Sequence, residues 1–151
     1  MKLKKLVSAV TALSVVAALC TSLSGCGEKK SDKYKVGICQ LAQHDALDAA
    51  TQGFKDALKE KLGDKVTFDE QNAAGEPATC TTIVNQFVSG KVDLIFANAT
   101  GALQAAVSAT DSIPIVGTSI TDYATALEMK DWSGKTGINV TGTSDLAPLD
   151  K

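Results

Sequence analysis

The sequence has no arginine and only one histidine among its 151 residues, and aromatic residues make up 5% of it. All 15 basic residues are therefore lysines, against 17 acidic residues. Without arginine, an anionic ligand must be held by lysine, hydroxyls, backbone N–H groups or a helix N-terminus, and not by a guanidinium fork. A single histidine argues against a zinc or haem site, and the acidic balance argues against nucleic acid as a partner. We predict no metal and no cofactor.

Cysteine is also too scarce for a disulfide framework. Of the four cysteines, Cys20 and Cys26 lie in the N-terminal stretch described next, which leaves Cys39 and Cys80. Cys39 ends an apolar run and Cys80 falls in the first turn of a predicted helix, so we interpret both as small core residues. Such positions in neighbouring β/α units seldom have the Cα separation of about 4.4–6.8 Å that a disulfide requires. We expect the two thiols to be unpaired, with a disulfide as the alternative.

The N-terminus has the features of a bacterial lipoprotein signal peptide. Three lysines among the first five residues precede the mostly apolar segment 6–19, and Leu23-Ser24-Gly25-Cys26 has the form of a lipobox. Fourteen helical residues span about 21 Å, less than the ~30 Å hydrocarbon core of a membrane, so the segment is interpreted as a cleaved signal. We predict a signal peptide over 1–25, diacylation of Cys26 and an extracytoplasmic, lipid-anchored protein. The alternative is an ordinary secretory signal.

Cleavage there would leave 126 residues with 12 lysines against 17 acidic residues. That length suits a single domain with one core. Residues 26–33 are polar and lack apolar periodicity, which is typical of a flexible tether. The folded domain is therefore predicted over 34–144.

Apolar runs rich in β-branched residues alternate with helical periodicity along this domain. Asp45 and Thr100 are candidate helix caps, and Gly63 is a predicted helix stop. Strands are predicted over 36–39, 66–68, 92–96, 113–116 and 138–140, and helices over about 46–62, 77–89, 101–110 and 122–129. Five strands joined by helices imply an α/β fold, a doubly wound parallel sheet with right-handed crossovers.

Ligands of such a sheet bind beyond the carboxyl ends of its strands. The predicted loops there are rich in uncharged hydrogen-bonding groups and poor in catalytic ones, which favours capture of a small polar or zwitterionic molecule. We predict ligand-binding residues in the loops after the first, third and fourth strands: Gln40, His44, Asn98, Ala99, Thr100, Gly101, Ser119, Thr121 and Asp122.

Several of these residues have a second interpretation. His44 could be a general base, but no nucleophile motif accompanies it, so a role at the helix entry is favoured. Thr100 could cap the helix that follows, although a hydroxyl and N-terminal N–H groups would also suit a carboxylate. Asp122 is a candidate partner for a ligand ammonium group and could equally cap the next helix. Ser119 and Thr121 could form only a turn.

The segments resemble, in order and spacing, the ABC transporter substrate-binding lipoproteins of the tryptophan/tyrosine-type family. The resemblance runs from about Tyr34 to Asp145. It is carried by Val36-Gly37-Ile38-Cys39-Gln40-Leu41, His44-Asp45-Ala46-Leu47-Asp48-Ala49-Ala50, Gln71-Asn72-Ala73-Ala74-Gly75-Glu76-Pro77-Ala78-Thr79, Val92-Asp93-Leu94-Ile95, Ile113-Pro114-Ile115-Val116, Thr121-Asp122 and Asn139-Val140-Thr141-Gly142-Thr143-Ser144-Asp145.

The resemblance implies a type I periplasmic-binding-protein-like fold, in which two lobes close around a small molecule and deliver it to an ABC permease without catalysis. An aromatic amino acid is the ligand class it favours; a purine-like molecule, a sugar or another amino acid are alternatives. The implied partners are this ligand, the permease, and the membrane through the lipid on Cys26. The chain would supply the N-terminal lobe, with 145–151 starting the crossover to a second lobe that it lacks. A sensor module that binds a receptor is the rival function.

Overall fold

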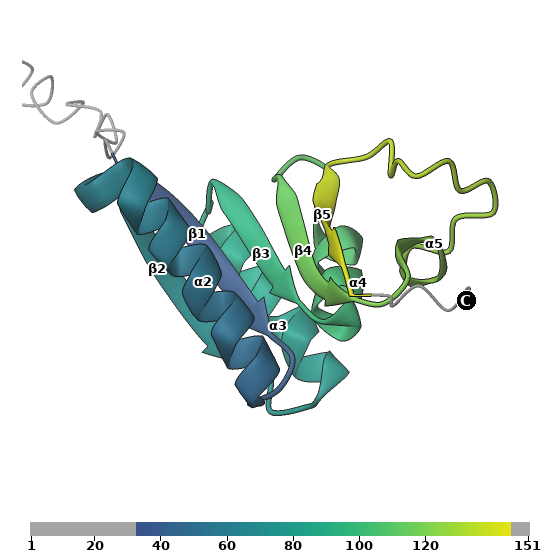
Figure 1. Cartoon of the computed structure of the whole chain (residues 1–151), viewed down its shortest axis with the longest axis horizontal. Helices are drawn as coiled ribbons and strands as arrows, with labels where there is room; N and C mark the ends of the chain where they lie inside the picture. Colours follow the sequence, from purple (N-terminus) through teal and green to yellow (C-terminus); the bar gives the residue numbers. More distant parts are fainter. Residues whose placement is uncertain (1–32, 146–151) are drawn as a thin grey trace, which may run out of the picture. The chain divides into compact units, whose positions relative to one another are not determined.

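The computed structural model describes residues 33–145 (Figure 1). The predicted signal peptide, nearly all of the predicted tether, Cys20 and Cys26, and residues 146–151 lie outside these described residues. Within residues 33–145, no helix is long and apolar enough to cross a membrane.

The core of the fold is a five-stranded sheet with the order β2-β1-β3-β4-β5, in which every neighbouring pair is parallel. The strands are β1 (Tyr34–Gln40), β2 (Val66–Asn72), β3 (Leu94–Asn98), β4 (Ile115–Ile120) and β5 (Val140–Ser144). Strand order reverses between β1 and β3, because β2 lies on one side of β1 and all later strands lie on the other. The predicted doubly wound parallel sheet is confirmed.

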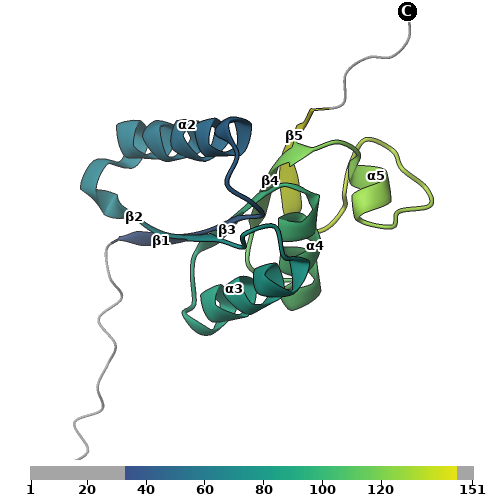
Figure 2. The same ribbon diagram turned by 90° about the horizontal axis from the view of Figure 1, so that it is seen from below.

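Helices cover both faces of the sheet. Figure 2 shows α2 (Asp45–Leu62) on one face, and α3 (Pro77–Ser89) and α4 (Thr100–Ala109) on the opposite face. A 3₁₀ turn, η1 (Gly63–Lys65), follows α2, and the short helix α5 (Tyr123–Ala126) follows β4. Each face has its own apolar cluster, and the larger cluster is the one beneath α3 and α4.

Two glycines let bulky side chains lie directly against the sheet. Phe87 of α3 is fully buried over Gly37, where a Cβ atom would lie 2.6 Å from the phenylalanine ring. Gly117 of β4 similarly leaves room for Tyr123, since a Cβ atom there would lie 2.5 Å from the tyrosine hydroxyl. Gly142 of β5 is the register partner of Gly117, and a Cβ atom at this position would overlap the same hydroxyl. Phe87 and Tyr123 can therefore lie against the sheet only because Gly37, Gly117 and Gly142 have no side chains.

The helix ends follow simple local rules with two exceptions. Pro77 is the first residue of α3, as predicted, and Gly63 ends α2 with a φ of 55°. The predicted cap Asp45 is wrong by one residue, because His44 is the N-cap and its Nδ1 accepts from Ala46 N at 3.2 Å. Thr100 is also not a cap: it is the first residue of α4, and its predecessor has no capping side chain.

The predicted strands end too early, because they stop at the last apolar residue. The parallel ladder continues into polar residues, pairing Gln40 of β1 with both Asn72 of β2 and Asn98 of β3. The last predicted strand is likewise displaced from 138–140 to 140–144, and the helix predicted over 122–129 shortens to four residues. Backbone pairing is indifferent to side-chain polarity, so hydropathy alone could not locate these ends.

Cys39 and Cys80 are free thiols in this structure, as predicted. The spatial reason for that prediction is wrong, because the two side chains belong to one core cluster and lie close enough for each to affect the pKa of the other. Ala73 N donates to Gln40 O at 2.8 Å, so the loop between β2 and α3 is attached to the end of β1. This attachment places the first turn of α3 over Cys39.

Candidate functional site

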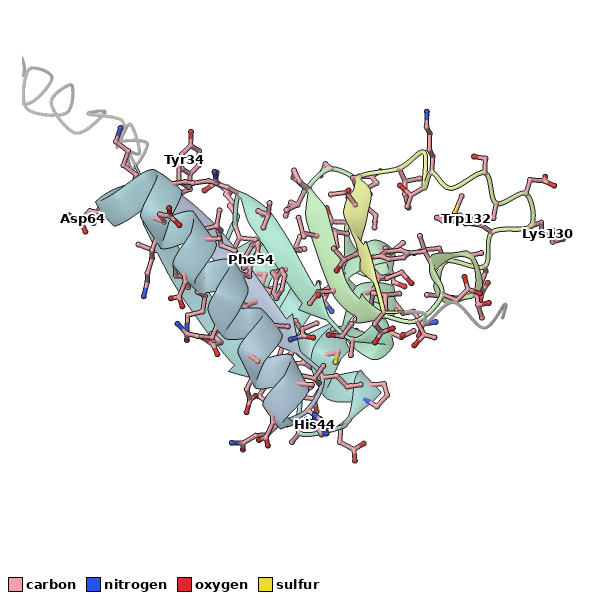
Figure 3. All side chains as sticks on the ribbon, viewed as in Figure 1. Tyr34, His44, Phe54, Asp64, Lys130 and Trp132 are labelled. Atoms are coloured by element: carbon pink, nitrogen blue, oxygen red, sulfur yellow. The ribbon has the colours of Figure 1, made fainter. Side chains whose placement is uncertain are left out.

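The carboxyl ends of β1, β3 and β4 are joined by backbone hydrogen bonds that extend beyond the strands. Leu41 N donates to Asn98 O at 3.1 Å, and Ala99 N donates to Thr118 O at 3.0 Å. The segments that follow these three strands therefore begin side by side at one edge of the sheet. In Figure 3, His44 lies at the end of α2 that adjoins this edge.

A buried polar cluster lies directly under the edge. The Gln40 side chain is 4% exposed and accepts from Thr51 Oγ1 at 2.7 Å, while its Nε2 donates to Asp48 of α2 and to the Ala42 carbonyl. Asn98 is fully buried, and its Nδ2 donates to Thr51 Oγ1 at 2.9 Å. These bonds fix the first turns of α2 relative to the ends of β1 and β3.

Asn98 is only partly satisfied. Its Nδ2 also donates to Leu47 O at 2.8 Å, yet its Oδ1 is buried with no hydrogen-bond partner among the residues that the structure describes. Unsatisfied buried acceptors are rare in native proteins, because each one loses its hydration without replacement. This one stands at the end of a strand, immediately before a helix.

The junction between β3 and α4 is strained. Ala99 has φ 86° and ψ 159°, a region of backbone space that is essentially restricted to glycine. Such strain costs of order 1–3 kcal/mol and occurs preferentially at binding and catalytic sites. Ser119, at the corresponding place in β4, also has a positive φ of 57°. Two of the predicted site residues are thus strained positions that no sequence pattern indicated.

The first turn of α4 begins at Thr100 without a side-chain cap. The N–H groups of a first helical turn have no partner within the helix, and the helix dipole makes this end attractive to an anion. Gly101 packs closely against Leu41, since a Cβ atom there would lie 3.3 Å from a leucine methyl carbon. Of the predicted residues, Asn98 therefore ends β3, Ala99 joins it to α4, and Thr100 and Gly101 begin α4.

Asp122 has the capping role that the sequence left open. As N-cap of α5 it accepts from Ala124 N at 2.9 Å and from Thr125 Oγ1 at 2.6 Å. The hydrogen bond from Thr125 is the main cause of a pKa below the usual value for this carboxyl. Thr121 is exposed, and its carbonyl accepts from Ser144 Oγ at 2.9 Å.

Two hollows adjoin the sheet. One, of about 370 Å³, is lined by Gln40, Gln43, Asp48, Glu70, Gln71 and Asn72. The other, of about 430 Å³, lies beside β5 and includes Tyr123, Trp132, Lys135 and Thr136 in its lining. Apart from Gln40, the predicted ligand residues belong to neither hollow, so what they share is the open edge of the sheet.

Thr51 and Asp48 belong to the polar cluster beneath the candidate site, and the sequence analysis did not predict them. Thr51 lies one helical turn after Leu47 and three residues before Phe54, on the face of α2 that the apolar spacing assigns to the core. A hydroxyl at such a position needs a buried partner. That spacing could have revealed Thr51, but not that Gln40 and Asn98 are its partners.

A family model described as ABC transporter substrate binding protein matches residues 35–151. The chain belongs to this family. The resemblance noted from the sequence is therefore confirmed, and the edge described above is part of a substrate-binding-protein lobe.

Individual relatives agree with this assignment. The chain is 39% identical over 166 residues to a tyrosine-binding protein of Clostridioides difficile, a match that covers 99% of this chain and 47% of that protein. It thus spans about half the length of this curated relative.

Solved structures are similar over most of the described residues. A ligand-free, open substrate-binding protein with adhesive properties from Clostridium difficile is 42% identical, with a TM-score of 0.71 over 77% of this chain and 40% of that one. A Streptococcus pneumoniae ABC domain in complex with L-Trp is 36% identical, with a TM-score of 0.69 over 76% of this chain and 39% of that one. A Burkholderia mallei periplasmic binding protein, 10% identical with a TM-score of 0.51 over 62% of this chain and 28% of that one, shares the fold.

Proposed function

We propose that this chain forms one ligand-binding lobe of an ABC importer's substrate-binding protein, and that its ligand is an aromatic amino acid. The ligand class is supported by the relatives, of which one is named for tyrosine binding and another holds L-Trp. The observation that carries the proposed site is the strained, uncapped start of α4 next to the half-satisfied Asn98.

In this proposal the α4 N-terminus receives the ligand carboxylate. The N–H groups at Thr100 and Gly101 and the Thr100 hydroxyl supply donors, and the helix dipole supplies the favourable potential that arginine provides in other proteins. Asp122 offers a charge for the ligand ammonium group, in competition with its capping hydrogen bonds to α5. The remaining partners, a permease and a second lobe that completes the clamp, belong to the same proposal.

The proposed location is outside the cytoplasmic membrane, with Cys26 as the lipid-bearing first residue of the mature chain. This follows from the lipobox in the sequence and from the family. Expression of Cys26→Ser in a bacterial host tests it, because loss of the lipid should move the protein out of the membrane fraction. An unmodified Cys26 in the mass spectrum of the membrane-bound protein would contradict the proposal.

Ligand binding is tested by titrating the isotope-labelled chain with L-Trp and L-Tyr while amide NMR signals are recorded, with L-Leu as the non-aromatic control. A single lobe makes only part of the contacts of a closed clamp, so we expect weak binding that shifts the amides of Thr100, Gly101 and Ser119. Thr100→Val and Asp122→Ala should each weaken binding by about 1–3 kcal/mol, because each leaves a polar ligand group without its partner.

Thr82→Val is the matched control for Thr100→Val. Thr82 lies on the exposed side of α3, and its hydroxyl bonds only to the Ala78 carbonyl of its own helix, at 3.3 Å. Equal affinity of all these variants for aromatic amino acids would show that the site is misplaced. Shifts caused equally by L-Leu would show that the ligand class is wrong.

A further inference from the structure

Two thiols that the proposed ligand site does not use lie next to each other in the core. Cys39, near the end of β1, and Cys80, in the first turn of α3, are both 0% exposed and belong to one apolar cluster. The two thiols lie close enough for each to affect the pKa of the other. Metal binding does not account for them, since residues 33–145 contain no group of three metal-ligating side chains.

Backbone hydrogen bonds hold both cysteines in place. Gly75 N donates to Leu41 O at 2.7 Å, which attaches the loop before α3 to the segment after β1. Cys80 N donates to Glu76 O at 3.2 Å within the first turn of α3, and α3 packs against β1. Neither thiol can leave the other unless this part of the core opens.

We propose that Cys39 and Cys80 form an intramolecular disulfide when the chain folds in an oxidising compartment. The bond would tie the end of β1 to the start of α3 and enclose α2 and β2 in one covalent loop. This modification site lies outside the proposed function and shares with it only the extracytoplasmic location, where disulfides persist. The two sulfurs are already neighbours, so a bond of about 2.05 Å requires only a further approach of two side chains.

The reaction balances with a small disulfide such as oxidised glutathione as the two-electron oxidant. The thiolate of one cysteine attacks one glutathione sulfur, forms a mixed disulfide and releases the other glutathione. The thiolate of the second cysteine then attacks the sulfur of the first, which forms the Cys39–Cys80 bond and releases the second glutathione. Two electrons pass from the cysteines to the oxidant, and the two cysteine protons end on the two glutathione thiols.

The surroundings of the thiols determine when this happens. Burial raises the pKa of both thiols in the folded protein, and for Cys80 the interaction with Cys39 opposes this rise. In the folded, reduced protein both sulfurs are covered and little thiolate exists, so reaction with a dissolved oxidant is slow. The bond therefore forms while the chain folds and not after.

The test is oxidative refolding of the full chain. The reduced, unfolded chain is refolded with oxidised and reduced glutathione, alkylated, and digested with trypsin without reduction. Cleavage after lysine places the cysteines in three peptides, 6–29, 36–55 and 66–91, so a link between 36–55 and 66–91 differs in mass from any link to 6–29. We expect 36–55 joined to 66–91, and a thermal midpoint that falls by at least about 5 °C when the bond is reduced.

The controls separate this bond from other oxidation. Cys39→Ala and Cys80→Ala should each abolish the cross-link and the effect of reductant on the thermal midpoint, whereas a chain with Cys20→Ser and Cys26→Ser should retain both. Folded, reduced protein should cross-link at least ~10-fold more slowly than refolding protein. Alkylated, unlinked 36–55 and 66–91 after refolding, or a link from either peptide to 6–29, would overturn the proposal.

Discussion

The two faces of the sheet are built differently. Beneath α3 and α4, side chains such as Phe87, Leu103 and Ile115 are fully buried, and the Tyr123 hydroxyl is buried there without a hydrogen-bond partner among the described residues. Beneath α2, fewer apolar residues are fully covered, and Phe54, Leu58 and Phe68 are only partly buried. On this second face the apolar contacts give way, toward the carboxyl edge, to the Gln40–Thr51–Asn98 cluster.

The difference indicates that one face of the sheet contributes mainly to stability and the other mainly to the geometry of the candidate site. Burial of apolar surface is the main stabilising contribution, and more apolar side chains are fully buried beneath α3 and α4, so this face should account for most of the stability. A buried polar cluster adds little net stability but fixes a unique geometry, since each member is expensive to leave unpaired. The α2 face should therefore set the shape of the candidate site.

The largest expected effect comes from truncating a ring on the tightly packed face. Phe87→Ala should lower the free energy of unfolding by about 3–5 kcal/mol, because it removes a fully buried ring and leaves a cavity. Phe54→Ala on the α2 face should cost less, about 1–3 kcal/mol, although Phe54 stacks on Phe96 with ring centroids 3.9 Å apart. Urea unfolding of the two variants measures the contrast; equal losses would show that the faces do not differ.

The next effect concerns the polar cluster. Thr51→Val keeps the shape of the side chain but removes the donor to Gln40 and the acceptor of Asn98, so it should destabilise the chain by about 1–3 kcal/mol. Thr82→Val on the exposed side of α3 is the matched control and should change stability by less than about 0.5 kcal/mol. Indistinguishable unfolding curves for the two variants would show that the hydrogen bonds of the polar cluster do not affect stability.

A smaller effect of opposite sign is expected at the strained junction. Ala99→Gly relieves a conformation that suits glycine, so it should raise the free energy of unfolding by about 1 kcal/mol after the entropy cost of the added glycine. Ala105→Gly, in the interior of α4, should lower it by about 1 kcal/mol. If the strain serves ligand capture, Ala99→Gly should also alter aromatic amino acid binding in the NMR titration. Destabilisation by Ala99→Gly would show that the junction is not strained.

The smallest effect is electrostatic. Because the folded-state pKa of Asp122 is lowered, its ionised form contributes stability above the unfolded-state pKa, and this contribution is lost as pH falls through the folded-state value. NMR titration of the Asp122 carboxyl should give a pKa below the ordinary value, and Thr125→Val should raise it by removing the main hydrogen bond. An unchanged pKa in Thr125→Val would assign the shift to another cause.

Periodicity and helix signals predicted the fold because they report burial and local backbone preference, which agree in the main helices and strands of residues 33–145. The apolar run 36–39 is buried throughout, as an interior strand of a parallel sheet requires, and Pro77 and Gly63 mark helix ends. The site was predicted only as a set of loops. Nothing in the sequence marks Ala99 as strained. Alanine ordinarily adopts a negative φ, so an alanine at this position does not predict the positive φ that the structure shows. The contact between Cys39 and Cys80 depends on a loop attached to a distant strand end, which local patterns do not encode.

The notch formed by Gly117 and Gly142 couples positions that are distant in sequence. Because the Tyr123 hydroxyl occupies the space where side chains of these two residues would lie, the tolerance of each glycine to substitution depends on residue 123. Gly117→Ala should be harmful beside tyrosine and less so beside phenylalanine, whose ring lacks the hydroxyl oxygen that lies closest. Gly142 gains no such relief, since its Cβ would also overlap the Gly117 carbonyl. A change at Gly117 can therefore be compensated by a change at residue 123, whereas a change at Gly142 cannot.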